Sequence, residues 1–226
     1  MYEKKLIIAI DGPVGVGKGT LAVRLAKKLG ANYLYTGGMY RALTLLCLLK
    51  KIDVNNEEEV LNLLNKNLIT LKLTDLETRV FIEGKEVTDE IFSFEVNENV
   101  SVVAAHPRIR AEMVKRQKRM TEGLNIIVEG RDSATDVVPH ADLKIYLTAD
   151  VNVRAQRRLK QLQKRGVNVP IDEVLTEIKK RDKKDMERNA SPLKVVPDAF
   201  VIDTTILTIE ETVEKVIDKL QEKGLA

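Results

Sequence analysis

Apolar residues along the chain form short unbroken runs, and segments with helical spacing lie between these runs. The first run, KLIIAI at 5–10, is β-branched and does not alternate, which is typical of a strand covered on both faces. Two more runs of this type lie in NIIVEG at 125–130 and LKIYLTA at 143–149, and AFVIDTT at 199–205 predicts a fourth strand. Strands separated by helices predict an α/β fold with a doubly wound parallel sheet.

Helical spacing follows the first and the last of these strands. A helix is predicted from Lys18 to Leu29, with Gly30 as its stop. The final segment, TIEETVEKVIDKLQEKG, places Thr208 and Glu211 at the spacing of a capping box and ends at Gly224. The predicted sheet is therefore covered by helices on both faces.

The pattern changes between residues 68 and 91. Apolar and polar residues alternate in LITLKLTDLETRVFIEGKEVTDEI, and EGKE has the composition of a hairpin turn. This segment predicts a small antiparallel insert that is a satellite of the main sheet.

Length and composition narrow the class of protein. The 226 residues suffice for one sizeable α/β domain with insertions or for two small ones. The net charge of +3 is too small to indicate nucleic acid as a partner, and the N-terminal apolar run is too short for a signal peptide or a membrane span. We expect a cytoplasmic protein without a membrane partner. The single cysteine, Cys47, lies in ALTLLCLL and is interpreted as a buried structural thiol.

The turn after the first strand has the pattern G-x-x-x-x-G-K, in the strand, loop and helix order that holds phosphate. Glycine backbone can point successive N–H groups at phosphate oxygens, and the positive end of the helix adds to this attraction. Lys18 then supplies a full charge to the β- and γ-phosphates of a nucleotide. The residue after the lysine is Gly19 rather than Ser or Thr, and Thr20 is the hydroxyl assigned to Mg²⁺. The residues predicted to bind ATP in this loop are Gly12, Pro13, Val14, Gly15, Val16, Gly17, Lys18, Gly19 and Thr20.

Several arginines indicate a second phosphate site. Arg41 follows a turn at the start of a helix, Arg110 lies near a helix begun by Pro107, and Arg131 follows a buried strand in EGRD. The carboxyl end of a strand is where ligands bind in open α/β sheets, and the planar arginine fork grips phosphate oxygens in pairs. Each arginine alone is more typical of a solvated surface residue, except Arg131, whose place after a buried strand favours a ligand.

A basic segment at 154–188 is predicted to form two helical stretches around a loop at 166–170. By helical spacing, three arginines share a face of the first stretch, and Arg181, Asp185 and Arg188 share a face of the second. One interpretation is an exposed helix pair with many salt bridges. The other is a lid that closes over phosphates and excludes water.

These motifs resemble bacterial cytidylate kinases. The resemblance rests on IDGPVGVGKGTLA, YTGGMYRA, HPRIR, VEGRD followed by PHADLKIYL, and KKRDKKDMERNASPL, in this order over nearly the whole chain. The GKGT ending is shared with nucleoside monophosphate kinases generally, whereas TGGMYR, GRD and RDxxDxxR indicate the cytidylate branch. The insert at 68–91 is similar to the extra sheet of that branch.

The resemblance implies a role for each matching position. Thr36, Arg41, Arg131 and Arg188 would surround the acceptor phosphate, while Arg181 and Asp185 would reach its sugar. Ser101, Arg110 and Asp132 would bind the cytosine, and the lid arginines Arg154, Arg157 and Arg158 would serve ATP. Lys18, Arg131 and Arg188 are the predicted catalytic residues.

The implied kinase is one unit with three parts. The core comprises residues 1–35, 105–153 and 190–226, the monophosphate-binding region 36–104, and the lid about 154–189. The chain departs from the family pattern in SATDVVPHA after GRD and in Tyr35, where the family often has Asp. Both departures bear on the choice among CMP, dCMP and UMP.

The predicted activity is transfer of the γ-phosphoryl group of ATP to CMP or dCMP with Mg²⁺, by a monomer. The alternatives are another nucleoside monophosphate kinase, for AMP or UMP, and a P-loop GTPase or nucleic-acid-dependent ATPase. The chain has no N-K-x-D motif for guanine, few aromatic residues and no second ATPase motif, which disfavours the last class.

Overall fold

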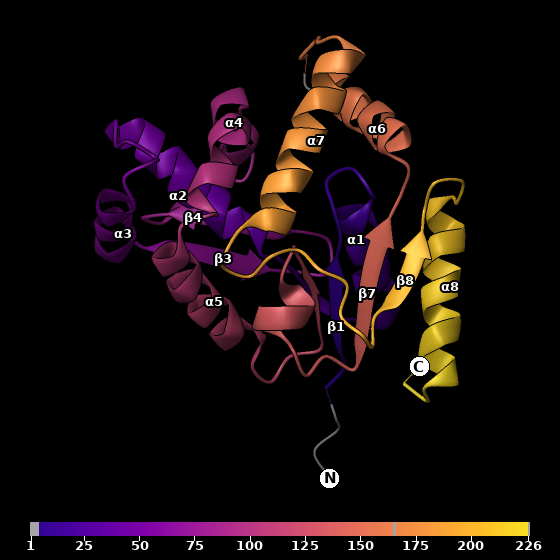
Figure 1. Ribbon diagram of the computed structural model, residues 1–226. Coiled ribbons are helices and arrows are strands. Elements are labelled where there is room, and N and C mark those ends of the chain that lie inside the picture. The colour runs from indigo at the N-terminus through magenta and orange to yellow at the C-terminus, as the bar shows by residue number, and fades with distance from the viewer. Residues whose placement is uncertain (1–4, 165, 226) are drawn as a thin grey trace.

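The computed structural model describes residues 5–164 and 166–225. Five parallel strands form its main sheet in the order β2-β6-β1-β7-β8 (Figure 1). They are β1 (Ile7–Asp11), β2 (Asn32–Tyr35), β6 (Ile126–Glu129), β7 (Leu143–Thr148) and β8 (Phe200–Asp203). The predicted doubly wound parallel sheet is confirmed. Its central strand, β1, places the glycine-rich turn at the carboxyl edge, between neighbours that come later in the chain.

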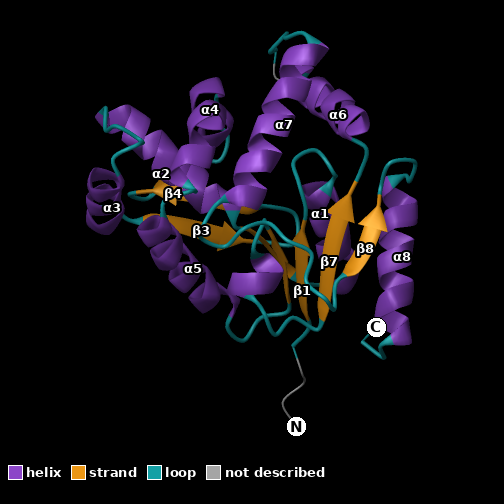
Figure 2. Cartoon of the chain, in the orientation of Figure 1, coloured by secondary structure: helices purple, strands orange, loops and turns teal. Residues whose placement is uncertain are grey.

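Helices cover both faces of this sheet. On one face, α1 (Lys18–Leu29) and α8 (Ile209–Glu222) share one apolar core with buried side chains of β1 and β7, and Figure 2 shows α8 beside β8. On the other face lie α5 (Pro107–Thr121) and η2 (Ser133–Val137), a π-helical turn directly after the GRD motif. Strand β6 is buried along its whole length because both of its faces are covered.

The predicted ends of the first helix and the predicted start of the last helix are confirmed. Helix α1 begins at Lys18 and ends at Leu29, and Gly30 adopts the left-handed conformation that closes it. Thr208 and Glu211 form both hydrogen bonds of the capping box at the start of α8.

The insert is antiparallel, as predicted. It consists of β3 (Ile69–Leu73), β4 (Thr78–Ile82) and β5 (Lys85–Glu86), and Glu83 and Gly84 form the hairpin turn with positive φ angles. Helices α2 (Gly37–Lys50), α3 (Glu57–Lys66) and α4 (Phe94–Val103) enclose it with the short η1 (Glu90–Phe92), as Figure 1 shows on the left. Together with α5 they share one apolar core, which is separate from the cores on the two faces of the main sheet.

The basic segment forms two helices, α6 (Val151–Gln163) and α7 (Ile171–Glu187), joined by the loop that was predicted at 166–170. Ala155, Val174 and Ile178 form their small shared core. The lower end of α7 reaches the carboxyl edge of the main sheet (Figure 1). The α6–α7 pair therefore extends away from the sheet, and the C-terminal end of α7 lies back at the carboxyl edge of the sheet.

Strand β2 was not predicted, because its four residues are too few for a clear pattern. Strand β8 is an edge strand, and Val201 is half exposed. Residues 1–4 and 226 of the predicted core and residue 165 of the predicted lid lie outside the described residues. In the described part of the chain, every helix falls short of the length or the hydropathy needed to cross a bilayer.

Candidate active site

The glycine-rich loop joins β1 to the first residue of α1. Gly12, Gly15 and Gly17 have φ angles of 148°, 81° and 96°, which disfavour residues with a side chain. A Cβ on Gly12 would lie 2.3 Å from the carbonyl oxygen of Leu147, and a Cβ on Gly15 would lie 2.9 Å from that of Arg154. The loop thus needs glycine for its conformation and for its close approach to β7 and α6.

Lys18 is folded back onto this loop. Its Nζ donates hydrogen bonds to the carbonyl oxygens of Gly12 and Pro13, both at 2.8 Å. Burial, together with the positive charge of Arg131, lowers the pKa of Lys18 to about 7. An anion bound at the loop would therefore stabilise the charged form of Lys18, because a full negative charge attracts the ammonium group more strongly than the two carbonyl dipoles do.

Two carboxylates approach the lysine from the sheet. Glu129, at the end of β6, accepts a hydrogen bond from the hydroxyl of Tyr33 at 2.7 Å. Asp11, at the end of β1, accepts from the backbone N–H groups of Ser133 and Ala134 and fixes the π-helical turn. Burial raises the pKa of Asp11 to about 6. Neither acid was predicted as a site residue, although both stand at carboxyl ends of buried strands.

The oxygen atoms near the loop fit the needs of Mg²⁺. This ion binds hard oxygen ligands, and at nucleotide sites it takes one or two from protein and the rest from phosphate and water. A Cβ on Gly19 would lie 3.5 Å from Oε2 of Glu129, and the exposed Thr20 lines the adjoining pocket. Across the described residues there is no group of three or more His, Cys, Asp or Glu that could hold a metal by itself. The carboxylate of Glu129 and the hydroxyl of Thr20 would suit a metal ion that brings phosphate and water as its other ligands.

The structure brings all nine predicted acceptor residues together in one pocket. The predicted residues that line it are Thr36, Arg41, Ser101, Arg110, Arg131, Asp132, Arg181, Asp185 and Arg188. They come from α2, α4, α5, α7 and the end of β6, so the main sheet, the insert and the helix pair all contribute. Five arginines against two aspartates leave an excess of three formal positive charges. Such a pocket suits a phosphate dianion.

Ion pairs hold most of these arginines in place. Arg110 pairs with Asp132, and both side chains are almost fully buried. Asp185 pairs with Arg131, from Nε to Oδ2 at 2.9 Å, and more loosely with Arg188 at 3.7 Å. Burial alone would raise the pKa of Asp185, but the surrounding arginines hold it below its usual range.

Arg181 is less well compensated than these arginines. Its Nε is buried without a hydrogen-bond partner among the described residues. Burial, together with the charges of Arg41 and Arg131, lowers its pKa to about 10. The pocket therefore holds positive charge that an anionic ligand would stabilise.

The acceptor pocket adjoins the glycine-rich loop. Arg131 lines the pocket and also contributes to the lowered pKa of Lys18, so the two cations are close enough to interact. The cavity measures about 60 Å³, far below the roughly 300–1,000 Å³ of pockets that enclose small molecules. Admitting a nucleotide therefore requires the walls of this pocket to move apart.

The three arginines of α6 reach different places. Arg154 donates to Asp182 at 2.5 Å and to the backbone carbonyl of Val14 at 3.2 Å, next to the glycine-rich loop. Arg157 donates to the hydroxyl and carbonyl oxygens of Thr204. Arg158 lines a cavity between α4 and the α6–α7 pair. Helical spacing predicted a common face, but the arginines on that face separate toward three neighbours.

Arg157 borders a second pocket beside the loop. This pocket measures about 380 Å³ and contains Gly15, Gly17 and Thr20 at one end. Its other walls are mixed: apolar residues alternate with basic and hydroxyl-bearing ones, among them Leu21, Leu207, Ile209, Lys160, Lys164 and Thr208. A pocket of this kind next to a phosphate-binding loop can accept a base against its apolar residues while the loop holds the phosphates.

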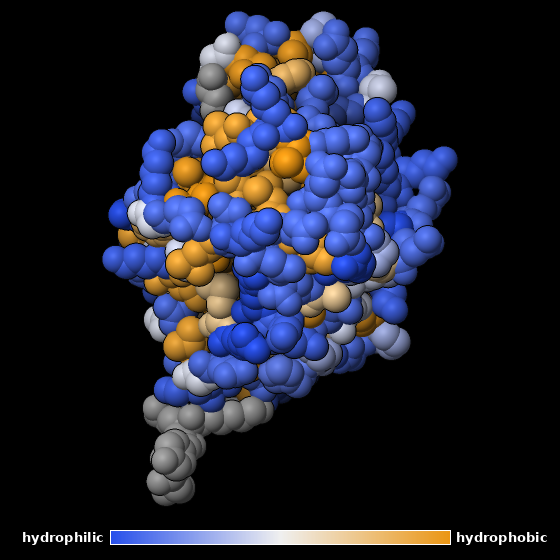
Figure 3. Space-filling view, turned by 90° about the vertical axis from the view of Figure 1, so that its left-hand side faces the viewer, coloured by the Kyte–Doolittle hydropathy of each residue, from blue (hydrophilic) through white to orange (hydrophobic). Residues whose placement is uncertain are grey.

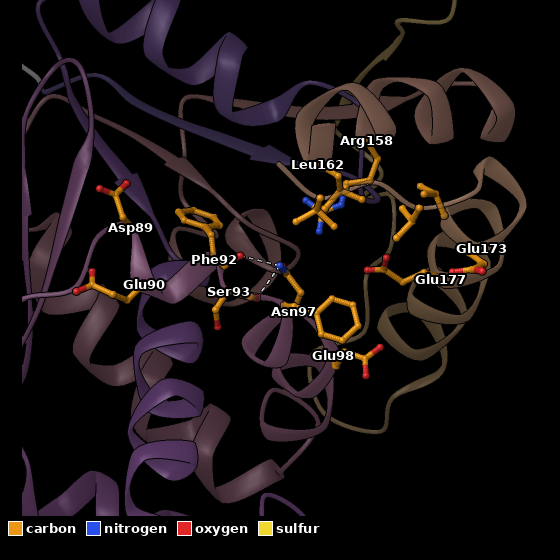
Figure 4. A pocket seen from close by; sticks show the side chains of 14 residues that line it. Asp89, Glu90, Phe92, Ser93, Asn97, Glu98, Arg158, Leu162, Glu173 and Glu177 are labelled. Atoms are coloured by element: carbon orange, nitrogen blue, oxygen red, sulfur yellow. Dashed lines mark hydrogen bonds between the residues drawn. The ribbon is translucent and has the colours of Figure 1, made fainter. Parts of the chain in front are cut away.

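The cavity that Arg158 borders measures about 540 Å³ and is a poor site for phosphate (Figure 4). Asp89 and Glu90 lie on one side, and Glu173 and Glu177 lie on the other. It shares no lining residue with the acceptor pocket. Figure 3 shows apolar side chains gathered on the upper half of the face that carries the insert, among hydrophilic ones.

Three further side chains, those of His106, Cys47 and Gln117, have structural roles. His106 lies with its Nε2 2.8 Å from the carbonyl oxygen of Val54, and Cys47 is buried with its pKa raised to about 11 by burial. Gln117 donates to the carbonyl oxygen of Thr36 at 3.3 Å and supports the pocket wall. Gln117 was not predicted as a site residue, and Tyr35 was noted only as a departure from the family pattern that bears on the choice of acceptor.

Comparison with known proteins gives one consistent family. Residues 8–222 match the protein-family model described as cytidylate kinase. The chain is 44% identical to the cytidylate kinase of Anoxybacillus flavithermus over 221 residues, which cover 98% of each chain. It is 45% identical to that of Bacillus licheniformis over 223 residues, which cover 98% of this chain and 99% of the relative.

Among solved structures, an uncharacterized protein from Eubacterium ventriosum has a similar fold. The two chains superpose with a TM-score of 0.52 over 97% of this chain and 99% of the other, at 13% sequence identity. At this identity the likeness concerns the fold alone.

Proposed function

Because the chain belongs to the cytidylate kinase family, we propose that it transfers the γ-phosphoryl group of ATP to CMP or dCMP, giving ADP and CDP or dCDP. The observation that carries this proposal is the pair of adjoining anion sites. One is the glycine-rich loop with Lys18, and the other is the pocket of five arginines, whose Arg131 interacts with that lysine.

ATP binds along the loop from Gly12 to Thr20. Backbone N–H groups and the start of α1 face its phosphates, and the pocket beside Arg157 receives its adenine. Arg154 and Arg158 approach from α6 when the donor binds. Thr20 and Glu129, directly or through water, would hold Mg²⁺, which would supply neutralisation of phosphate charge.

CMP binds in the arginine pocket. Thr36, Arg41, Arg131 and Arg188 surround its phosphate, while Arg181 and Asp185 reach the ribose. The cytosine has an exocyclic amine beside two acceptor atoms. Asp132 accepts from that amine, and Ser101 and Arg110 donate to the acceptors. Uracil has a carbonyl oxygen in place of the amine and would face the Asp132 carboxylate, so the pocket disfavours UMP.

Transfer requires alignment and charge neutralisation rather than proton removal. An oxygen of the CMP phosphate, already anionic at neutral pH, attacks the γ-phosphorus, and the bond from that phosphorus to the bridging β–γ oxygen breaks. Lys18, Arg131 and Arg188 stabilise the charge that spreads over the transferred group and the leaving ADP. No side chain acts as a general base.

The division of labour follows three parts of one monomeric, cytoplasmic enzyme. Residues 1–35, 105–153 and 190–226 form the core, and 36–104 form the monophosphate-binding region. Residues 154–189 act as a lid that excludes water when both nucleotides are bound. The acceptor pocket, which must widen to admit CMP, supports such movement.

A coupled assay of ADP formation with purified chain, ATP and one acceptor at a time tests the proposal. We expect CMP and dCMP to be phosphorylated with a much higher kcat/KM than UMP or AMP. An equal or higher kcat/KM with AMP would contradict the cytidylate assignment. ATP hydrolysis that nucleic acid stimulates, without transfer to any monophosphate, would contradict the kinase assignment altogether.

A further inference from the structure

The guanidinium of Arg41 is held by uncharged oxygens. Its Nε donates to the hydroxyl of Tyr35 at 2.9 Å. Its Nη1 donates to the carbonyl oxygen of Ile91 at 3.0 Å and to Oδ1 of Asn97 at 2.9 Å. These bonds use three of the five N–H groups of the fork. Within the described residues, Nη2 makes no hydrogen bond to protein.

Arg41 differs in this respect from its neighbours in the pocket. Arg110, Arg131 and Arg188 each pair with Asp132 or Asp185. In the described part of the chain, no carboxylate lies within ion-pair distance of Arg41. Its orientation is fixed, but its charge is not neutralised.

Tyr35 has a fixed position of its own. Its ring stacks on that of Phe92, with centroids 6.1 Å apart and an interplanar angle of 6°. A Cβ on Gly37 would lie 2.7 Å from the Tyr35 ring, so glycine leaves the space that the ring occupies. The guanidinium carbon of Arg41 also lies 4.9 Å from the Phe92 centroid, a favourable cation–π distance. The phenol oxygen therefore meets Arg41 from a rigid support.

Asn97 meets Arg41 from the other side and is equally fixed. Its Nδ2 donates to the carbonyl oxygens of Phe92 and Ser93 at 2.9 and 2.8 Å, the two bonds drawn in Figure 4. Because the amide nitrogen is used by these carbonyls, the amide oxygen must face Arg41. The hydrogen bonds of Arg41 with Tyr35, Ile91 and Asn97 thus join the end of β2 to η1 and α4.

We propose that Tyr35 and Asn97 are positioning residues for the acceptor phosphate. They orient the Arg41 fork with neutral oxygens, so that Nη2 and the full positive charge remain available to the ligand. This inference rests on the proposed function, in which Arg41 binds the phosphate of CMP.

Tyr35→Phe removes the hydroxyl and keeps the stacked ring. By calorimetry, we expect the Kd of CMP to rise about tenfold, which corresponds to one hydrogen bond to a charged group. The Kd of ATP and the Kd of cytidine, which has the base and sugar without phosphate, should not change. The KM for CMP should rise in parallel while the KM for ATP stays constant.

A double-mutant cycle separates positioning from a direct or structural role. In the Arg41→Ala background, Tyr35→Phe should add no further loss of CMP affinity, because the residue acts through the missing arginine. Additive losses, or an equal loss of cytidine binding, would overturn the proposal, as would unchanged CMP binding in Tyr35→Phe.

Asn97→Ala provides a second test that does not alter the aromatic stack. It should also weaken CMP and spare cytidine. Asn99→Ala is the matched control, because Asn99 lies on the same helix and its amide donates only to the carbonyl oxygen of Glu95. Equal effects of the two variants would contradict the positioning role of Asn97.

The proposed function and this inference can fail separately. A wild-type chain that does not bind CMP would contradict both of them. An active wild type with an unaffected Tyr35→Phe variant would contradict this inference alone.

Discussion

Arg131 and Asp185 connect the main sheet to helix α7 through an ion pair of 2.9 Å inside the acceptor pocket. Arg131 follows β6 in the sequence, and Asp185 lies near the end of α7. The same aspartate also approaches Arg188. One carboxylate thus holds two of the cations assigned to the acceptor phosphate and fixes the lower end of the lid.

We expect Asp185→Asn to lower the free energy of unfolding at pH 7 by about 2 kcal/mol, because two partly buried arginines lose their anionic partner. The arginines hold the folded-state pKa of Asp185 below its usual 3.8, so its contribution is present above that pH and is lost as the pH falls through the folded-state pKa. Urea denaturation at pH 7 and in an acid series measures the difference.

The exposed pair of Lys144 and Asp198 provides the control for this variant. Asp198 is 65% exposed, so Asp198→Asn should change stability little. A difference between Asp185→Asn and the wild type that persists undiminished at about pH 2 would show that the carboxylate charge is not its cause.

ATP binding should take up a proton at Lys18. With a pKa of about 7, the ligand-free lysine is mostly neutral at about pH 8, and the ATP phosphates favour its charged form. Calorimetric titrations in two buffers of different ionisation enthalpy give the number of protons. Lys18→Ala should bind ATP without this uptake and should lose orders of magnitude in turnover while remaining folded. The same uptake in the variant would assign the proton to another group.

Gly12 and Gly17 should respond differently to alanine. Both have positive φ angles, so each substitution introduces backbone strain of about 1 kcal/mol. A Cβ on Gly12 would also overlap the carbonyl oxygen of Leu147, whereas a Cβ on Gly17 meets nothing within 4 Å. We expect Gly17→Ala to fold with a modestly lower melting temperature and Gly12→Ala to be severely destabilised. Equal melting temperatures for the two variants would show that the loop relaxes away from β7.

Arg181 should show a conflict between stability and binding. Its charge is buried near other arginines, and its pKa is lowered to about 10. We expect Arg181→Gln to raise the stability of the ligand-free chain by about 1 kcal/mol, while the KM for CMP rises. Thermal melts without nucleotide and steady-state kinetics measure the two effects. A less stable variant would mean that Arg181 is already compensated without ligand.

Much of the fold follows from local patterns in the chain. Buried strands, the capping box of Thr208 and Glu211 and the hairpin at Glu83 are each set by neighbouring residues, so the sequence predicts them. Strand β2 is only four residues long and takes its place through pairing with β6, a contact that local pattern does not contain. The order of strands in the sheet is likewise a long-range property.

The candidate site likewise has features that the sequence predicts and features that depend on contacts between distant segments. Eight of the nine acceptor residues lie in the quoted sequence motifs, Ser101 being the exception, and all nine line one pocket. The arginines of α6 show the limit of helical spacing, which predicts a shared face but not the neighbours of that face. Arg157 therefore reaches Thr204 while Arg158 borders a different cavity. The roles of Tyr35 and Asn97 depend on hydrogen bonds across three elements, and no spacing indicates them.

The adjacency of the donor and acceptor sites is tested most directly with a single molecule that spans both. Adenosine and cytidine joined through five phosphates would occupy the glycine-rich loop and the arginine pocket at once. We predict that its Kd by calorimetry lies at least about 100-fold below the Kd of ATP or of CMP, because linking the two ligands makes the second binding event intramolecular. Binding no tighter than that of ATP alone would contradict the adjacency of the two sites.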